Sequence, residues 1–182
     1  MVWRWDQGRM DYFQYDSIKA IAGVLAKLDG VNLDSKIDPL RSPLTAATEL
    51  PFAPAAYTVW RNYSRVFGCE ILATRIGSNL VCTQLCQELS KATGSVATVD
   101  DYLAYVSRVF YYPSPIFEGY NSTSPQVFPF CAILKLLAAK SLSNGSTFIT
   151  IDDILTLLIA NNIKCKEPLT AYVTLTKRAI SP

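Results

Sequence analysis

Apolar residues recur at helical spacing in the second half of the chain and predict a defined order of elements. Residues 130–137 are an apolar helical run, and residues 141–146 are a polar loop with Asn-Gly as its turn signal. Residues 147–149 are short, apolar and rich in β-branched side chains, as in a strand. Thr150, followed three residues later by Asp153, has the pattern that caps a helix N-terminus. This pattern predicts helix, loop, short strand and helix.

An earlier stretch repeats the same order. Hydrophobic spacing predicts a helix over residues 57–74, a turn followed by a short strand over 77–82, and a helix over 84–89. A third helix, opened at Thr98 by the same capping pattern, is predicted to run to about residue 110. Its first turn is acidic, which suits the helix dipole.

Helix, loop, short strand and helix make up the first half of a winged helix-turn-helix. The sequence therefore predicts a mainly α (α+β) protein with tandem winged helix-turn-helix units behind an N-terminal helical segment. The expected parts are an N-terminal arm and helical segment (1–56), a first winged-helix-like unit (57–125) and a second one (126–182). Residues 172–176 could form a strand or part of a third helix, and we expect the chain to be a fragment of a longer polypeptide.

Composition limits the classes of function. Half of the 182 residues are apolar and 18% are charged, which is typical of a globular chain. No apolar run approaches the length that spans a bilayer and the N-terminus is not a signal peptide, so we expect a cytoplasmic protein with no membrane partner. The five cysteines lie in apolar surroundings without a CxxC pair, and buried, reduced thiols are expected.

Candidate catalytic chemistry is missing from the sequence. Because the chain has no histidine, it cannot use an imidazole as a general base or complete a common zinc site. The Asp pairs fall at predicted helix caps, and none is followed by the Lys that a metal-dependent nuclease places on an adjoining strand. We therefore predict a binding protein with no catalytic residues, no metal and no cofactor.

The arginines and aromatic residues are the candidates for binding nucleic acid. The net charge of only +2 means that contact with DNA must rest on a local patch. Arg61 and Arg65 are four residues apart and should share one helical face, which is either a solvated face or a phosphate-binding one. The N-terminal aromatic residues either pack on the core or belong to a DNA-binding arm. The full candidate set is Trp3, Arg4, Trp5, Arg9, Arg61, Arg65, Arg75, Arg108, Tyr111, Tyr112, Tyr120 and Asn121.

The repeated pattern also resembles a known family. The segments 66–72 with 80–86, and 128–137 with 149–154, resemble the winged-helix DNA-recognition modules of modular type II restriction endonucleases. In that group two or three winged helices read DNA and a separate metal-dependent domain cuts it. The resemblance covers roughly residues 57–165. It implies a sequence- or modification-specific recognition domain for double-stranded DNA, with a C-terminal nuclease domain beyond Pro182. A reader that flips a modified base onto aromatic residues fits equally well.

A second hypothesis belongs to a different class. Winged helices also serve as dimerisation or scaffold domains, and a net charge near zero suits that use. The alternative is therefore a protein–protein interaction module that does not bind DNA, and the affinity for duplex DNA with its salt dependence separates the two.

Overall fold

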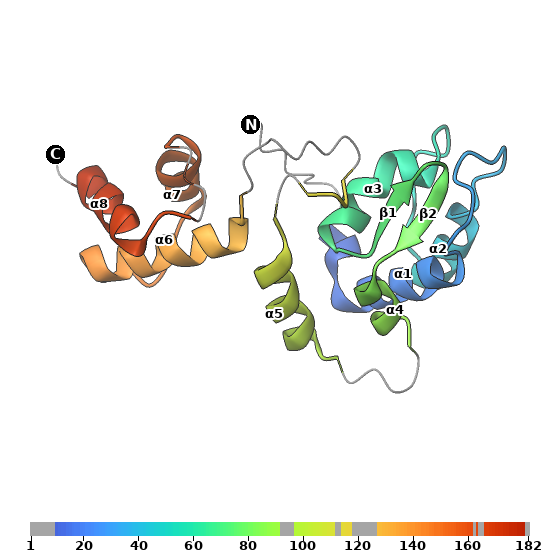
Figure 1. Cartoon of the computed structure of the whole chain (residues 1–182), viewed down its shortest axis with the longest axis horizontal. Coiled ribbons are helices and arrows are strands. Elements are labelled where there is room, and N and C mark those ends of the chain that lie inside the picture. The colour runs from blue at the N-terminus through green and yellow to red at the C-terminus, as the bar shows by residue number, and fades with distance from the viewer. Residues whose placement is uncertain are drawn as a thin grey trace. The chain divides into compact units, whose positions relative to one another are not determined.

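The structure is a computed structural model of the whole chain, and the chain divides into two compact units that we describe separately (Figure 1). Unit 1 comprises Met1–Tyr102 with Pro115–Tyr120, and unit 2 comprises Leu103–Ser114 with Asn121–Pro182. The residues that the structure describes are 10–91, 97–111, 114–117, 127–161, 163 and 166–180.

The described residues are mostly helical, with one small antiparallel sheet, which confirms a mainly α or α+β protein. Unit 1 holds η1 (Met10–Phe13), α1 (Tyr15–Lys27), α2 (Arg41–Thr48), α3 (Val59–Cys69), β1 (Ala73–Ile76), β2 (Asn79–Cys82) and α4 (Gln84–Leu89). Helix α5 (Val99–Val109) begins in unit 1 and ends in unit 2. Unit 2 continues with α6 (Pro129–Asn144), α7 (Ile151–Asp153), the π-helical stretch η2 (Ile154–Ile159) and α8 (Leu169–Ile180).

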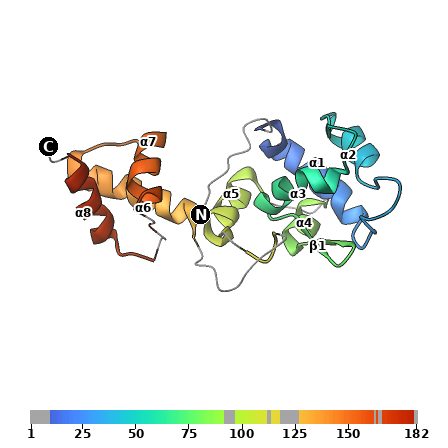
Figure 2. The ribbon, with the colours of Figure 1, turned by 90° about the horizontal axis from the view of Figure 1, so that it is seen from above.

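The core of unit 1 forms around α1, which packs against α2 and α4 (Figure 2). Ile18, Ile21 and Leu25 lie at the spacing of one helical face, and all three are buried. The apolar face of this amphipathic helix is therefore turned toward the interior.

The proline-rich connection between α2 and α3 is held by side chains from both flanking helices. Arg41 of α2 donates hydrogen bonds to the carbonyl oxygens of Phe52 and Tyr57. The Tyr63 hydroxyl of α3 lies 3.1 Å from the carbonyl oxygens of Pro51 and Ala53. These bonds satisfy backbone acceptors that no helix or strand partner reaches.

Strands β1 and β2 form a hairpin in which Ile76 pairs with Asn79 across the two-residue turn Gly77-Ser78. Gly77 has φ +61°, a conformation that the tight hairpin turn requires and that glycine adopts without steric cost. The segment after α1 lies along the other edge of β2. The Gly30 amide donates to the Leu80 carbonyl at 2.9 Å, and the Leu33 amide donates to the Ser78 carbonyl at 2.8 Å.

The helix predicted over residues 57–74 is wrong at its C-terminal end, because α3 stops at Cys69 and residues 73–76 form β1. Ile71 adopts a left-handed conformation with φ +58°, and the Leu72 amide donates to the Phe67 carbonyl at 2.8 Å. This is the bonding of a Schellman cap, which ends a helix and usually has glycine at the left-handed position. Thr83 holds the turn, since its hydroxyl donates to the Ile71 carbonyl at 2.6 Å.

The helix caps predicted at Thr98 and Thr150 are confirmed. Thr98 accepts a hydrogen bond from the Asp101 amide at 3.2 Å, and the Asp101 carboxylate accepts one from the Thr98 amide at 2.9 Å. Thr150 and Asp153 form the same reciprocal capping box at α7. The predicted helix over 84–89 coincides with α4.

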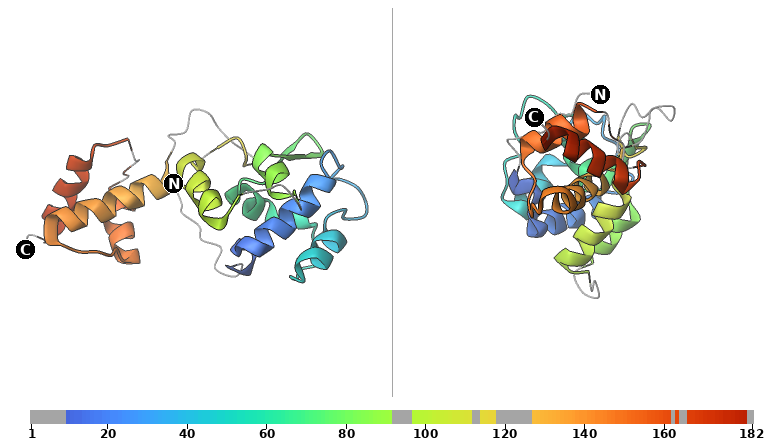
Figure 3. Two further views of the ribbon diagram at one scale, coloured as in Figure 1. Left: turned by 90° about the horizontal axis from the view of Figure 1, so that it is seen from below. Right: turned by 90° about the vertical axis from the view of Figure 1, so that its left-hand side faces the viewer.

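Unit 2 is built on α6 and α8, which pack together and enclose a small apolar core (Figure 3). Its buried members are Ala132, Leu136, Ala139, Leu157, Leu158 and Tyr172. Residues 172–176 lie within α8, so they form a helix rather than a strand.

The strand predicted over residues 147–149 is wrong, because the chain there runs as an irregular connection into α7. The Ser146 hydroxyl donates to the Phe148 carbonyl at 2.8 Å, which engages locally an acceptor that a sheet would use. Phe148 itself is 64% exposed. The β-branched composition of this segment was not enough to form a strand without a neighbouring one.

The expectation that all cysteines are reduced is wrong for Cys131 of α6, which is disulfide-bonded. Cys69, Cys82 and Cys86, which the structure also describes, are not disulfide-bonded. Among the helices of the described ranges, none has the length and apolar character needed to cross a bilayer.

Candidate nucleic-acid interface

Helix α3 presents two arginines to solvent on the side opposite its buried face. Arg61 and Arg65 are exposed, as their spacing of four residues predicts. The opposite face is fixed in the core of unit 1 by Val59, Trp60, Tyr63, Val66 and Phe67. Because the buried side chains set the rotation of the helix, the two arginines emerge together from adjacent turns.

The start of α3 is held by two caps. The Thr58 hydroxyl accepts a hydrogen bond from the Arg61 amide at 3.3 Å, and the Asp38 carboxylate accepts one from the Val59 amide at 2.7 Å. The Arg61 guanidinium lies over the Tyr57 ring, with its carbon 4.0 Å from the ring centroid. This cation–π contact orients the side chain while leaving its edge donors for an acceptor.

Neither Arg61 nor Arg65 is neutralised within the part of the chain that the structure describes, since no carboxylate there lies within 4.0 Å of their nitrogens. Arg41 and Arg75, by contrast, are each ion-paired. Two like charges on adjacent turns repel each other slightly, and an anion placed between or beside them removes that repulsion.

Arg75 lies on β1 and not on a continuation of α3. Its Nη2 atom is 2.7 Å from the Asp34 carboxylate, and its Nε atom donates to the Gly77 carbonyl at 2.7 Å. The first bond joins the hairpin to the segment after α1, and the second fixes the guanidinium against the hairpin turn.

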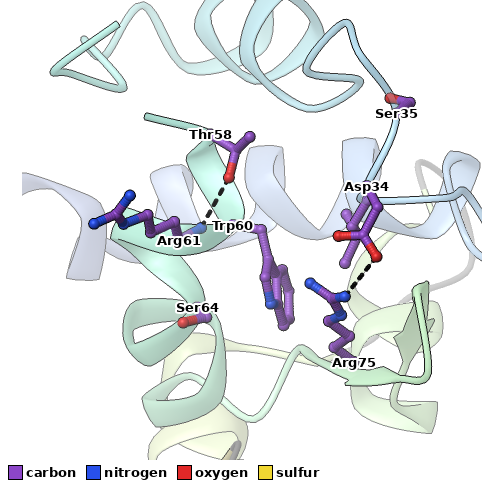
Figure 4. Close-up of a pocket in the computed structure, with 8 residues that line it drawn as sticks. Asp34, Ser35, Thr58, Trp60, Arg61, Ser64 and Arg75 are labelled. Atoms are coloured by element: carbon purple, nitrogen blue, oxygen red, sulfur yellow. Dashed lines mark hydrogen bonds and ion pairs between the residues drawn. The ribbon is translucent and has the colours of Figure 1, made fainter. Parts of the chain in front are cut away.

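A pocket of about 510 Å³ lies between the start of α3, the segment after α1 and β1 (Figure 4). The Trp60 indole lies between Arg61 on one side and Arg75 on the other, and the Asp34 carboxylate faces Arg75 (Figure 4). The residues lining the pocket are Leu33, Asp34, Ser35, Thr58, Trp60, Arg61, Ser64 and Arg75. The hydroxyls and guanidinium groups among these lining residues are donors suited to an anionic or polar ligand.

The remaining described candidates lie in unit 2. Arg108 is exposed in the last turn of α5, and Tyr111 is half-buried with its ring centroid 5.4 Å from that of Phe128. Arg61, Arg65 and Arg75 lie on unit 1, where Arg61 and Arg75 line the same pocket, whereas Arg108 and Tyr111 belong to the other unit. Trp3, Arg4, Trp5, Arg9, Tyr112, Tyr120 and Asn121 lie outside the described residues, and their assignment stays a prediction.

The sequence reasoning missed the polar residues that support this surface. Thr58 could have been found, because a threonine before an amphipathic run is a helix-cap signal. Asp34 could not, since its partner Arg75 is distant in sequence and nothing local predicts their contact.

A buried carboxyl group lies at the end of α3. Glu70 is 1% exposed, and within the described residues neither of its carboxylate oxygens has a hydrogen-bond partner. Burial raises its pKa well above the ordinary value, because removal from water penalises the charged form. Within the described ranges, no cluster of acidic or cysteine side chains could hold a metal ion.

Comparison of the chain with protein-family models, curated proteins and solved structures found no match. The functional argument therefore depends on the geometry of the chain itself.

Proposed function

We propose that unit 1 binds double-stranded DNA through the exposed face of α3. The observation that carries the proposal is the pair Arg61 and Arg65, which emerge together from a helix locked into the core and have no carboxylate partner in the described structure. Phosphate contacts supply most of the affinity for DNA, and arginine is well suited to them because its planar fork binds two oxygens at once.

The order of elements in unit 1 supports a winged helix displaced toward the N-terminus from the one that the sequence predicts. In this proposal α1, α2 and α3 are the three helices, the segment paired with β2 through Asn32 is the first strand, and the β1–β2 hairpin is the wing. Helix α3 then takes the position of the recognition helix, which lies in the major groove. Arg75 lies on the wing beside it.

The net charge of +2 shapes how such binding would work. General attraction to DNA is weak at this charge, so a few placed arginines must supply the contacts. The resemblance of the sequence to recognition modules of modular restriction endonucleases supports a sequence- or modification-specific target-recognition role. In that setting a nuclease domain of the parent protein performs the cleavage.

The sharpest test is the double variant Arg61→Ala with Arg65→Ala, measured by fluorescence anisotropy on a panel of unmodified and methylated duplexes. If both arginines contact phosphates, the slope of log affinity against log salt falls in magnitude by about 1.8, which is twice 0.9. The thermal midpoint should barely move, because both side chains are exposed.

A matched control removes two other exposed cations of unit 1, with Lys19→Ala and Lys27→Ala on α1. This variant has the same net charge as the arginine variant and should keep the wild-type slope. If the salt slope falls equally in both variants, or if the arginine variant binds DNA as the wild type does, the exposed face of α3 is only solvated.

A second candidate function, a protein–protein interaction module, is favoured by exposed apolar side chains in unit 2. They include Phe130, Leu134, Leu142, Phe148, Ile151 and Leu155, which are 40–76% exposed. Exposed apolar side chains that gather into one contiguous patch mark an interaction surface. If the wild-type chain binds no duplex at low salt and self-associates in light scattering, this candidate replaces DNA binding.

A further inference from the structure

The Asp34–Arg75 ion pair suggests how the proposed interface is completed, and the argument rests on the proposed function. We infer that Arg75 contacts a DNA phosphate and that Asp34 is an internal competitor, whose carboxylate the phosphate replaces on the guanidinium. The two residues come from the segment after α1 and from β1, at the edge of the pocket beside α3 (Figure 4).

Arg75 keeps its orientation without Asp34. Its Nε atom donates to the Gly77 carbonyl at 2.7 Å, so the guanidinium stays fixed on the hairpin when the carboxylate leaves. A guanidinium has five N–H donors, and the two observed bonds use one on Nε and one on Nη2. The Nη edge that Asp34 occupies is the edge that binds a phosphate oxygen.

The pair is also easy to separate. The Asp34 side chain is 56% exposed and the Arg75 side chain is 28% exposed, so water screens their attraction. No other bond of the Asp34 carboxylate holds it in place in the described structure, since its backbone amide rather than its side chain bonds to Asn32. An incoming phosphate therefore displaces a weakly held group.

The geometry places Arg75 on the opposite side of Trp60 from Arg61 (Figure 4). The two arginines consequently address different phosphates. The interface of α3 and the hairpin then consists of separate arginine contacts, and among the described residues a carboxylate pairs with Arg75 but not with Arg61 or Arg65.

The test is a double-mutant cycle on the full chain with Asp34→Asn, Arg75→Gln and both together, using a duplex that the wild type binds and salt from 50 to 200 mM. Arg75→Gln should lower the magnitude of the salt slope by about 0.9, which makes the loss of affinity over this range about 3.5-fold smaller. Asp34→Asn should tighten binding by up to about fivefold, the range expected for an exposed pair. In the Arg75→Gln background the Asp34→Asn gain should disappear.

The double-mutant cycle distinguishes displacement of Asp34 from Arg75 by a phosphate from general repulsion between Asp34 and DNA. Asp16→Asn, which removes an exposed carboxylate from α1 in the same unit, is the charge-matched control and should change affinity less than Asp34→Asn does. An equal gain from Asp34→Asn with and without Arg75 would overturn the inference, as would an unchanged slope in Arg75→Gln.

The outcome for the proposed function is read separately. If the Arg61/Arg65 double variant loses binding while the Asp34 and Arg75 variants behave as wild type, the Arg75 contact is wrong and DNA binding by α3 stands. If the wild type binds no duplex, both proposals are wrong.

Discussion

The buried carboxyl of Glu70 makes a quantitative prediction about the stability of unit 1. Glu70→Gln keeps the size and shape of the side chain but removes its ability to ionise. In the folded protein Glu70 is 1% exposed, and its two carboxylate oxygens have no hydrogen-bond partner in the part of the chain that the structure describes. The group is therefore held in its neutral form to a higher pH in the folded chain than in the unfolded chain.

The direction of the effect follows from proton linkage. Burial raises the folded-state pKa above the unfolded value of about 4.3, so between these two values the folded chain binds more protons than the unfolded chain. Stability falls as pH rises through this interval and levels off above the folded-state pKa. The slope within the interval is up to about 1.36 kcal/mol per pH unit, the free energy of one pKa unit.

The assay is urea unfolding of the full chain at half-unit steps from pH 4 to pH 8, followed by circular dichroism. The stability of Glu70→Gln minus that of the wild type should be nearly constant below about pH 4.3. Above that pH it should grow in favour of the variant, by up to about 1.36 kcal/mol per pH unit. Groups that titrate in both proteins cancel in this difference.

Glu70→Met provides a second variant in case an amide at this position disturbs the fold. Methionine is unbranched and apolar, so it fills a similar space without leaving polar atoms unsatisfied. The stability of Glu70→Met minus that of the wild type should grow with pH in the same way as for Glu70→Gln. Curves that stay parallel to the wild type from pH 4 to pH 8 in both variants would refute the argument.

Further predictions concern local features of both units. Thr150→Ala removes a side-chain cap and should lower the stability of unit 2 by about 1 kcal/mol in thermal unfolding. Cys131→Ser removes a disulfide and should cost about 2–4 kcal/mol, an effect that a reductant reproduces in the wild type but does not add to in the variant. The pKa of Asp153 is lowered, first by its hydrogen bond from Lys140, so stability should fall as pH drops below the ordinary Asp value and Lys140→Met should reduce that dependence. Gly77→Ala meets no neighbouring atom but forces alanine to φ +61°, and it should cost about 1 kcal/mol without changing the pH dependence of unfolding.

Sequence reasoning was most accurate where the determining contacts are local. The caps at Thr98 and Thr150 depend on a partner three residues away, so their pattern was sufficient. The boundary between α3 and β1 was missed, because the left-handed conformation of Ile71 depends on bonds to a distant residue, Thr83. The strand over 147–149 was predicted from composition alone, although a strand also needs a neighbour in space.

The candidate site divides in the same way. The shared exposure of Arg61 and Arg65 follows from helical spacing and was predictable. The pairing of Arg75 with Asp34 was not, because it depends on how the hairpin meets the segment after α1. The disulfide at Cys131 escaped prediction because the number of cysteines alone does not reveal which of them meet.

The turn at Ile71 and Leu72 has a mechanical consequence for unit 1. The Thr83 hydroxyl donates to the Ile71 carbonyl at 2.6 Å, and the Thr83 amide donates to the Leu72 carbonyl at 2.8 Å. These two bonds tie the turn between α3 and β1 to the residue that follows β2. We therefore expect α3 and the hairpin to behave as one rigid body, with a constant distance between the start of α3 and the hairpin turn. A partner that contacts both ends meets a preorganised surface, so binding does not carry the entropy cost of fixing that distance.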